Sequence, residues 1–332
     1  MKLIKITIDH TTAGQNIDKA ILASGVDLSR KEIRRILDRG GIQCNGKRVF
    51  VASQTVKRGD QIVLTHHPAL STKEVALSPL EEKDILYWKH DIIAVNKAPG
   101  IASVETASSK TPYVKKQMLP LLKSKAVDAS LIKPCHRLDK ETSGVLLFAY
   151  GDQKAQYIMD QFRKHEIRKV YHALCYGIPK DKRWEVNCQL SGIDKRTGRV
   201  KVLSSGGYSS SSSFQVIAIS KKHNVSLIQV APKTGRSHQI RVHLLHSKFP
   251  IIGDKKYSLA SSKPLHPSLA ELSLQHHFLH ASSIEFTPSE GEKRVELKAP
   301  LPQLFHSFIK KSQMEFLVKF DELIISPLVK TS

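Results

Sequence analysis

Apolar residues recur at helical spacing within the first 65 residues of the chain. Ile17, Ala20 and Ile21 share one face, which predicts a first short helix. Ser29 and Glu32 have the spacing of a capping box, and they therefore mark the start of a second helix. The buried face of this second helix is predicted to consist of Ile33, Ile36 and Leu37.

Short strands are predicted after the second helix. An Asn-Gly pair at 45–46 favours a left-handed turn, so residues 42–44 and 47–49 are expected to pair as a hairpin. A Gly-Asp pair at 59–60 turns the chain into a last strand over residues 61–65. These elements together predict a small α/β unit at the start of the chain.

A linker separates this unit from the rest of the chain. Residues 66–82 have mixed polarity and contain prolines, so we place the domain boundary near Thr72. The predicted domains are residues 1–72, with the linker, and residues 73–332. At 332 residues the chain is long enough for two domains.

The larger domain alternates between strand and helix patterns. A helix is predicted over residues 154–165, and strands are predicted over residues 85–95, 169–177, 214–219 and 225–230. The serine-rich segment 204–213 is interpreted as a flexible hairpin loop. Gly235 ends the strand before it, and a helix is expected to follow.

The stretch from Cys135 to Gly144 is a polar loop that runs directly into an apolar strand over residues 145–149. If the loop is extended, side chains alternate, and Arg137 and Asp139 then share one face. On spacing alone an exposed ion pair is the favoured interpretation, because such pairs are common and weak. The alternative is a reactive carboxylate held beside a rigid strand.

Charge distinguishes this chain from an average globular protein. It contains 52 Lys and Arg against 30 Asp and Glu, a formal net charge of +22, which indicates a polyanionic partner. No apolar run approaches the ~20 residues that span a bilayer, and the N-terminus does not resemble a signal peptide. Nucleic acid is therefore the expected partner, and a membrane is not.

Basic residues concentrate on the second predicted helix. Residues 1–65 contain 12 Lys and Arg against six Asp and Glu. The basic stripe on the helix consists of Arg30, Lys31, Arg34, Arg35 and Arg39. A charged stripe is usually only a solvated helix face, but here it is followed by a basic hairpin that contains Lys47.

Cysteine and histidine spacing predicts no metal site. The four cysteines form no C-x-x-C pair, which fits free thiols in a reducing cytoplasm; they are Cys44, Cys135, Cys175 and Cys188. His276 and His280 have a spacing that can bind metal on a helix. Because no acidic or Cys partner lies beside them, they are interpreted as packing or surface residues. Neither a metal nor a cofactor is expected.

Four motifs together change the interpretation of the central stretch. His-Arg-Leu-Asp at 136–139, followed by Thr-Ser-Gly and an apolar strand, resembles the active-site motif of the RluA-type pseudouridine synthases. Three further segments resemble the first, second and third of the other motifs of that family. They are Val-Asn-Lys-Ala-Pro-Gly at 95–100, Lys-x-Tyr at 169–171 and Thr-Gly-Arg-Ser-His-Gln-Ile-Arg-Val-His at 234–243. The Ala-Pro order in the first and the Ser in the third depart from the family pattern. The resemblance covers about residues 83–310. Lys97 in isolation could suggest a covalent-lysine ligase, but a lone Lys in a turn is weak evidence, and support of the active-site loop is the favoured interpretation.

The N-terminal domain resembles the small S4-like RNA-binding module over about fifty residues. That resemblance implies that the basic helix and hairpin contact RNA phosphates, through Arg30, Lys31, Arg34, Arg35 and Lys47. Phosphate contacts would position an enzyme on RNA without reading its sequence.

The resemblance implies an α+β fold, in which a pseudouridine-synthase-like catalytic domain on a central mixed, largely antiparallel sheet follows a small α/β RNA-binding domain. The implied reaction breaks a glycosidic bond, turns the uracil and rejoins it through carbon, without a cofactor. Asp139 would be the nucleophile, attacking either the uracil ring or the anomeric carbon. Arg236 would form the ion pair that favours the charged carboxylate.

The remaining roles also come from the resemblance. Tyr171 would stack on the flipped base and relay the final ring proton, directly or through a water. Ile240 would form part of the apolar pocket wall, and Lys169 would bind the substrate. Arg137 would fill the space that the flipped base leaves.

Two other functions are compatible with parts of the pattern. A non-catalytic RNA-binding or ribosome-assembly protein on the same fold is expected to lack Asp139, Tyr171 or Arg236, and all three are present. A zinc deaminase would need His-x-Glu and Cys-x-x-Cys ligands, which the chain lacks. The prediction is therefore a monomeric RNA pseudouridine synthase that acts on large-subunit ribosomal RNA, with transfer RNA as the other candidate substrate.

Overall fold

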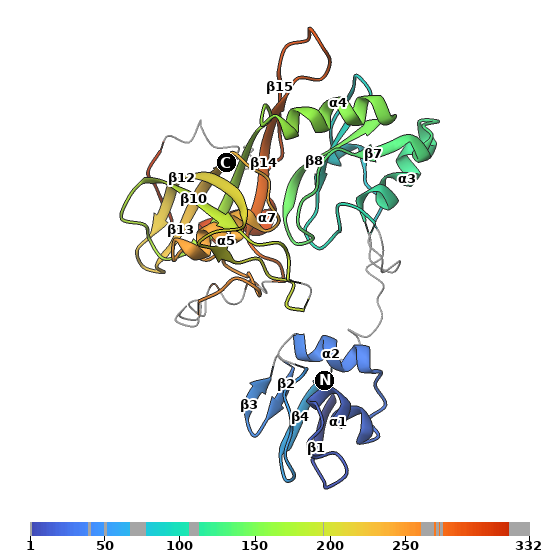
Figure 1. The fold of residues 1–332 in the computed structure, drawn as a ribbon, viewed down its shortest axis with the longest axis vertical. Helices are drawn as coiled ribbons and strands as arrows, with labels where there is room; N and C mark the ends of the chain where they lie inside the picture. The colour runs from blue at the N-terminus through green and yellow to red at the C-terminus, as the bar shows by residue number, and fades with distance from the viewer. Residues whose placement is uncertain are drawn as a thin grey trace, which may run out of the picture. The chain divides into compact units, whose positions relative to one another are not determined.

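The computed structural model describes residues 2–38, 41–49, 52–66, 78–105, 113–194, 196–259, 269, 272 and 275–318. It divides into two compact units, Met1–Leu77 and Ser78–Ser332 (Figure 1). The predicted boundary near Thr72 lies outside the described residues. Within these ranges, no helix is long and apolar enough to cross a membrane.

The first unit packs two helices against a four-stranded antiparallel sheet. The strands, in order across the sheet, are β1 (Lys2–Thr7), β4 (Gln61–His66), β2 (Ile42–Cys44) and β3 (Lys47–Val49). The helices are α1 (Ile17–Ala23) and α2 (Arg30–Asp38), and their apolar faces share one core with the sheet. Both helices and the hairpin are therefore confirmed, whereas β1 was not among the predicted elements.

Local side-chain chemistry explains two of these boundaries. The backbone N–H of Ser29 donates to the Glu32 carboxylate, and the Glu32 N–H donates to the Ser29 hydroxyl, which is the predicted capping box. Asn45 and Gly46 both have positive φ, of 50° and 76°, as a two-residue hairpin turn requires.

A single twelve-stranded sheet forms the framework of the second unit. Its main order is β11-β10-β12-β13-β9-β14-β8-β6-β5, with β15 beside β14, β16 beside β12 and β7 beside β8. The strands are β5 (Ile85–Lys89), β6 (Ile92–Lys97), β7 (Ile132–Pro134), β8 (Ser143–Tyr150), β9 (Arg168–Tyr176), β10 (Arg183–Leu190), β11 (Val202–Leu203), β12 (Tyr208–Ser220), β13 (Val225–Pro232), β14 (Leu279–Phe286), β15 (Val295–Lys298) and β16 (Glu315–Phe316). Among these described strands only β14 and β8 pair in parallel, which confirms the mixed, largely antiparallel sheet.

Helices pack on strands in both halves of this sheet. They are α3 (Val114–Ser124), α4 (Asp152–Arg163), α5 (Gln239–His246) and α7 (Gln303–Lys311), with short 3₁₀ helices η2 (Glu82–Asp84) and η3 (Ala129–Leu131). The helix α4 packs along β8 and β7, and α5 packs on β12 (Figure 1). The strand β8 is held between two apolar cores, and β9 packs into a third, which makes both strands rigid supports for the loops that precede and face them.

Two predicted segments differ from the structure. Residues 85–95 are a hairpin rather than one strand, because His90 and Asp91 adopt positive φ of 54° and 59° and reverse the chain. The serine-rich segment, predicted to be a loop, becomes part of β12 from Tyr208 onward. It is a strand because β10 pairs along it and β13 pairs with its C-terminal part, and because the buried Ser210 hydroxyl donates to the Cys188 carbonyl.

Gly144 is required where β8 meets β14. Its φ is +111°, and a Cβ built on it would lie 2.7 Å from the Ala281 backbone nitrogen. We expect Gly144→Ala to lower the free energy of unfolding by more than about 2 kcal/mol, because backbone cannot move aside cheaply. Gly291→Ala is the matched control, since Gly291 is exposed and has φ +79° with no atom within 4 Å, and it should cost only about 1 kcal/mol. Urea unfolding of both variants measures the difference, and equal losses would contradict the steric argument.

Candidate active site

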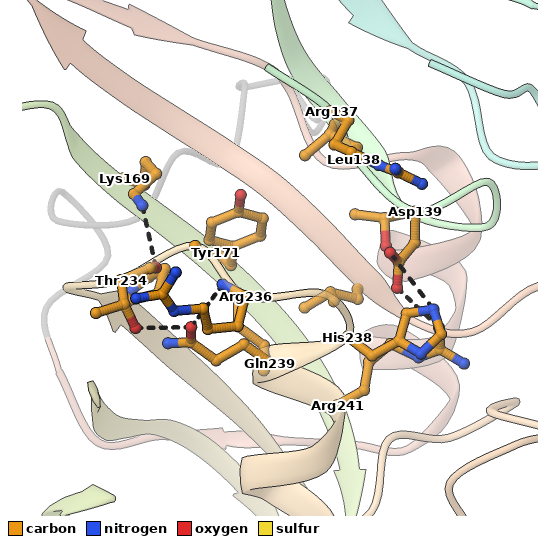
Figure 2. Close-up of a pocket in the computed structure, with 15 residues that line it drawn as sticks. Arg137, Leu138, Asp139, Lys169, Tyr171, Thr234, Arg236, His238, Gln239 and Arg241 are labelled. Carbon is orange, nitrogen blue, oxygen red and sulfur yellow. Dashed lines mark hydrogen bonds and ion pairs between the residues drawn. The ribbon is translucent and has the colours of Figure 1, made fainter. Parts of the chain in front are cut away.

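One pocket in the second unit gathers all six catalytic-domain residues that the sequence motifs predicted. Asp139 and Arg137 reach it from the loop before β8, and Lys169 and Tyr171 from β9 (Figure 2). The segment between β13 and α5 supplies Arg236, and α5 itself supplies Ile240; these residues line the pocket together with Leu138, Thr142, Pro232, Thr234, Gly235, His238, Gln239, Arg241 and Leu279.

The loop that carries Asp139 is fixed by buried polar groups. Lys97 is 1% exposed, and its ammonium donates to the carbonyls of Ala98, Ile101 and Lys140 at 2.8–3.0 Å. This is the supporting role that was predicted for Lys97. Burial lowers the pKa of Lys97 to about 7.

Ser103 fixes the loop at the residue next to the candidate nucleophile. Its hydroxyl donates to the Leu138 carbonyl at 2.8 Å and accepts the Leu138 N–H at 2.9 Å. Both backbone polar groups of Leu138 are thus satisfied within the protein. On the other side of Asp139, Thr142 hydrogen-bonds the His277 ring, and Glu141 pairs with His276. Asp139 is therefore presented by a loop whose backbone is held on both sides.

Asp139 pairs with Arg241, which corrects the prediction that Arg236 would be its partner. Nη1 of Arg241 lies 2.7 Å from Oδ2 of Asp139. Figure 2 marks this ion pair with a dashed line. Arg241 also forms a two-point contact with Asp254, from Nε at 2.6 Å and Nη2 at 2.9 Å. Asp254 itself is held by the backbone N–H groups of Lys256 and Tyr257. We call this arrangement the Asp139–Arg241–Asp254 network.

Charges in this network stabilise one another. The Arg241 side chain is 8% exposed and that of Asp254 is 0% exposed, so neither is well solvated. Burial alone would lower the pKa of Arg241, but the hydrogen bonds and charges of Asp254 and Asp139 raise it above its ordinary value. Burial likewise would raise the pKa of Asp254, and the Arg241 guanidinium lowers it instead. Arg241 therefore remains a cation that orients the Asp139 carboxylate, which is 23% exposed, toward the pocket.

Arg236 occupies a different position at the pocket. Its Nε donates to the Ser209 carbonyl at 3.1 Å, and its guanidinium carbon lies 5.6 Å from the Tyr208 ring centroid. The predicted ion pair was wrong because Arg236 precedes α5, whereas Arg241 lies within that helix. That Arg236 takes part in catalysis stays a prediction.

His238 is a pocket residue that the sequence did not single out. It has a left-handed backbone with φ 56°, and its Nε2 lies 3.9 Å from Oδ1 of Asp139. Nδ1 of His238 contacts the Tyr257 hydroxyl at 2.7 Å, and that hydroxyl accepts the Val200 N–H. Burial lowers the pKa of His238, and this effect exceeds the opposite effect of the Asp139 charge. The sequence signal for His238 was its place in the motif at 234–243, but its contact with Asp139 arises only when the chain folds.

Tyr171 and Lys169 enter the pocket from neighbouring positions on β9. Burial and the charge of Asp139 raise the pKa of Tyr171, so its phenol stays neutral. The Lys169 ammonium donates to the Thr234 carbonyl at 3.2 Å, and burial lowers the pKa of Lys169 to about 8. The pocket thus combines a carboxylate, a neutral phenol and an amine that titrates near neutral pH.

The depressed pKa of Lys169 predicts a pH dependence. Below pH 8 the side chain is a cation that attracts phosphate, and above it the charge is lost, so kcat/KM should fall as pH rises. The decline should approach about tenfold per pH unit, because one proton is lost. In Lys169→Met this step should disappear while any decline from other groups remains. An unchanged profile in Lys169→Met would show that Lys169 does not bind the substrate as a cation.

Among the described residues, no group of three or more His, Cys, Asp or Glu side chains is arranged to hold a metal. His276 and His280 point to separate partners, since His276 pairs with Glu141 and His280 contacts Ser143. All four cysteines are free thiols.

In the first unit, two of the predicted RNA-binding arginines are anchored to a buried acid. Arg30 and Arg34 each donate from Nε to Oδ2 of Asp18, at 3.0 and 2.8 Å. Their side chains are 43% and 54% exposed, whereas that of Asp18 is 1% exposed. Because Nε points inward, the outer nitrogens of both guanidinium groups remain for phosphate. The side chains of Lys31, Arg35 and Lys47 lie outside the described part of the structure.

This anchoring predicts that Asp18 supports RNA binding although it is acidic. Asp18→Asn adds one positive charge, yet we expect RNA affinity to fall about fivefold, because Arg30 and Arg34 lose their common ionic partner. Asp27→Asn makes the same charge change at an exposed site and should leave affinity equal or slightly higher. Filter binding at one salt concentration measures the RNA affinity of both variants. Tighter binding by Asp18→Asn than by the wild type would contradict the prediction.

Comparison with known proteins gives the family of this chain. The family model for RNA pseudouridylate synthase matches residues 91–246, and the S4 domain model matches residues 15–62. Ribosomal large subunit pseudouridine synthase C of Vibrio vulnificus is 29% identical over 310 residues, covering 92% of this chain and 95% of that protein. The protein of the same name from Pasteurella multocida is 30% identical over 308 residues, covering 89% of this chain and 90% of that protein.

A solved structure shares the fold. The structure of human RNA pseudouridylate synthase domain containing 1 aligns with a TM-score of 0.59 at 24% identity, over 75% of this chain and 94% of that one. The match supports the fold assignment, and the full-length similarity to the bacterial enzymes supplies the family. This chain is a member of the RNA pseudouridine synthase family, with an S4 domain ahead of its catalytic domain.

Proposed function

We propose that this protein converts specific uridines of large-subunit ribosomal RNA to pseudouridine, with Asp139 as the nucleophile. The observation that carries the proposal is the Asp139 carboxylate, held by Arg241 at the wall of a pocket that Tyr171 and Ile240 also line. The choice of ribosomal RNA rests on the similar bacterial enzymes, whose names give that substrate.

The reaction exchanges one bond of the uracil for another. The bond from N1 to the anomeric carbon breaks, a bond from C5 to that carbon forms, C5 loses a proton and N1 gains one. No electron acceptor is needed, because substrate and product are isomers. Asp139 attacks the ring or the anomeric carbon with its carboxylate, and the contact with Arg241 fixes the direction of that carboxylate.

The other pocket residues would hold the flipped uridine. A uridine must leave its stack to reach Asp139. Tyr171 offers the uracil an aromatic face and, as a neutral phenol, can exchange a proton with it. Ile240 provides an apolar wall at 7% exposure, and the exposed Arg137 can occupy the space left in the RNA. Lys169 supplies a positive charge at the pocket.

Pseudouridine mapping of unmodified large-subunit ribosomal RNA tests the proposal. Wild-type protein should introduce pseudouridine at one or a few positions, and Asp139→Asn should introduce none. A parallel incubation with unmodified transfer RNA tests the alternative substrate, and modification there alone would overturn the choice of ribosomal RNA. Salt-sensitive binding without modification of either RNA would favour a non-catalytic RNA-binding protein.

We further propose that the protein acts as a monomer in the cytoplasm. One chain supplies every residue that lines the described pocket, so no second copy is needed to complete it. The free thiols fit a reducing compartment. Light scattering of the purified protein, and fractionation of cells that express it, test these two statements.

A further inference from the structure

We infer that Tyr208 and Arg236 form a stacking platform for an unpaired base of the substrate RNA that flanks the target uridine. The inference rests on the proposed function and adds a binding subsite to it. The Arg236 guanidinium lies over the Tyr208 ring, with its central carbon 5.6 Å from the ring centroid. Tyr208 is 59% exposed, the most of any large apolar or aromatic residue among those described.

Arg236 connects this platform to the active site. It lines the pocket that contains Asp139, and its Nε is fixed by the Ser209 carbonyl at 3.1 Å. Gln239 holds the same segment, because its Oε1 accepts the Arg236 N–H at 2.9 Å (Figure 2). No carboxylate among the described residues lies within ion-pair distance of Arg236, so its charge is not neutralised by the protein there. A base beside the flipped uridine would meet this residue first.

Tyr208 lies on the face of β12 that packs against α5. Side chains alternate along a strand, so Tyr208 shares a face with Ser210 and Ser212. Ser210 contacts the ring of His243, and Ser212 accepts from Gln239; both partners belong to α5, which borders the pocket. Tyr208 therefore extends this face of the sheet beyond the pocket, as the first residue of the strand.

A close turn places Tyr208 at this position. Gly206 has φ +74°, and a Cβ on Gly207 would lie 2.8 Å from the Leu190 carbonyl oxygen. The Gly207 N–H donates to the Gln189 side chain at 2.7 Å. The serine-rich segment, which was predicted to be a flexible hairpin loop, is thus from Tyr208 onward a paired strand whose first side chain projects into solvent.

The chemistry of the platform fits an RNA base. An exposed aromatic ring backed by a guanidinium group stacks on bases, and the positive charge attracts the adjoining phosphate. An aromatic face stacks with any base, so the platform would hold the strand without selecting sequence. One face of Tyr208 is covered by Arg236, and its exposure leaves the other for the base.

The test uses an oligonucleotide that spans the uridine found by mapping, with an abasic residue placed in turn at three positions on either side. Tyr208→Ala should raise KM roughly tenfold and change kcat less than about twofold, because stacking binds but does not react. With the wild type, an abasic residue at one of these positions should raise KM by a similar factor. With that abasic oligonucleotide, Tyr208→Ala should have the same KM as the wild type. Tyr208→Phe should behave as the wild type.

Tyr150→Ala is the matched control. Tyr150 is 36% exposed and ends β8, at the opposite end of that strand from the active-site loop, so its loss should leave KM unchanged. Equal KM for wild type and Tyr208→Ala, or additive effects at every abasic position, would overturn the platform. An equal loss at all positions together with a fall in kcat would show instead that Tyr208 only supports Arg236.

A binding measurement separates this inference from the proposed function and from misfolding. 2-Aminopurine at the flanking position should be quenched when Asp139→Asn binds the oligonucleotide, and the quenching should be lost in Asp139→Asn with Tyr208→Ala. Absence of quenching at all six positions overturns the platform even if pseudouridine forms. Absence of pseudouridine with the wild type instead overturns the proposed function, and the platform, which rests on that function, is overturned with it.

Discussion

Asp139→Asn is expected to lower kcat/KM for pseudouridine formation by more than about a thousandfold, because the amide is a poor nucleophile. RNA affinity should stay within about threefold, since most of the binding energy comes from phosphate contacts elsewhere. The free energy of unfolding should fall by no more than about 1 kcal/mol. Arg241 keeps its two-point contact with Asp254, and the asparagine oxygen can still accept from Nη1.

Single-turnover assays with enzyme in excess measure this loss without interference from product release. Asp152→Asn is the matched control, because Asp152 is an exposed acid at the start of α4, and its activity should equal that of the wild type. Residual activity above about a tenth of the wild-type rate in Asp139→Asn would assign the nucleophile to another residue. A large fall in RNA affinity would mean that Asp139 contributes mainly to binding.

Local sequence patterns predicted most of the fold because the determining residues lie close together in the chain. The capping box of α2 needs only Ser29 and Glu32, and the β2–β3 turn needs only Asn45 and Gly46. The serine-rich start of β12 was misread because serine carries little strand preference of its own. It forms a strand because β10 and β13 pair with it and because Ser210 and Ser212 find partners in α5.

The active-site motifs located the pocket but could not decide the partner of Asp139. Arg236 and Arg241 belong to the same motif and both line the pocket. Their separation depends on His238, whose left-handed backbone lets α5 begin after Arg236. It depends also on Asp254, which lies 13 residues beyond Arg241 and fixes its guanidinium. Neither dependence is visible in the spacing of one motif.

The role of Asp254 makes Arg241 the residue whose loss is expected to lower stability and activity together. Arg241→Met removes the cation between two carboxylates, and among the described residues it leaves the fully buried Asp254 charge with two backbone N–H donors and His277 nearby. Loss of one partner from a buried ion pair costs about 3–5 kcal/mol. We expect that loss in the free energy of unfolding, together with loss of activity, because Asp139 is no longer oriented.

A second substitution distinguishes folding from catalysis. In Arg241→Met with Asp254→Asn, no buried charge remains uncompensated, while the asparagine oxygen still accepts the N–H groups of Lys256 and Tyr257. Chemical unfolding should show that the double variant regains much of the lost stability. Its activity should stay below about a hundredth of the wild type, since the partner of Asp139 is still missing. Activity that returned with stability would show that Arg241 serves only the fold, because a positioning role requires the guanidinium itself to touch the carboxylate.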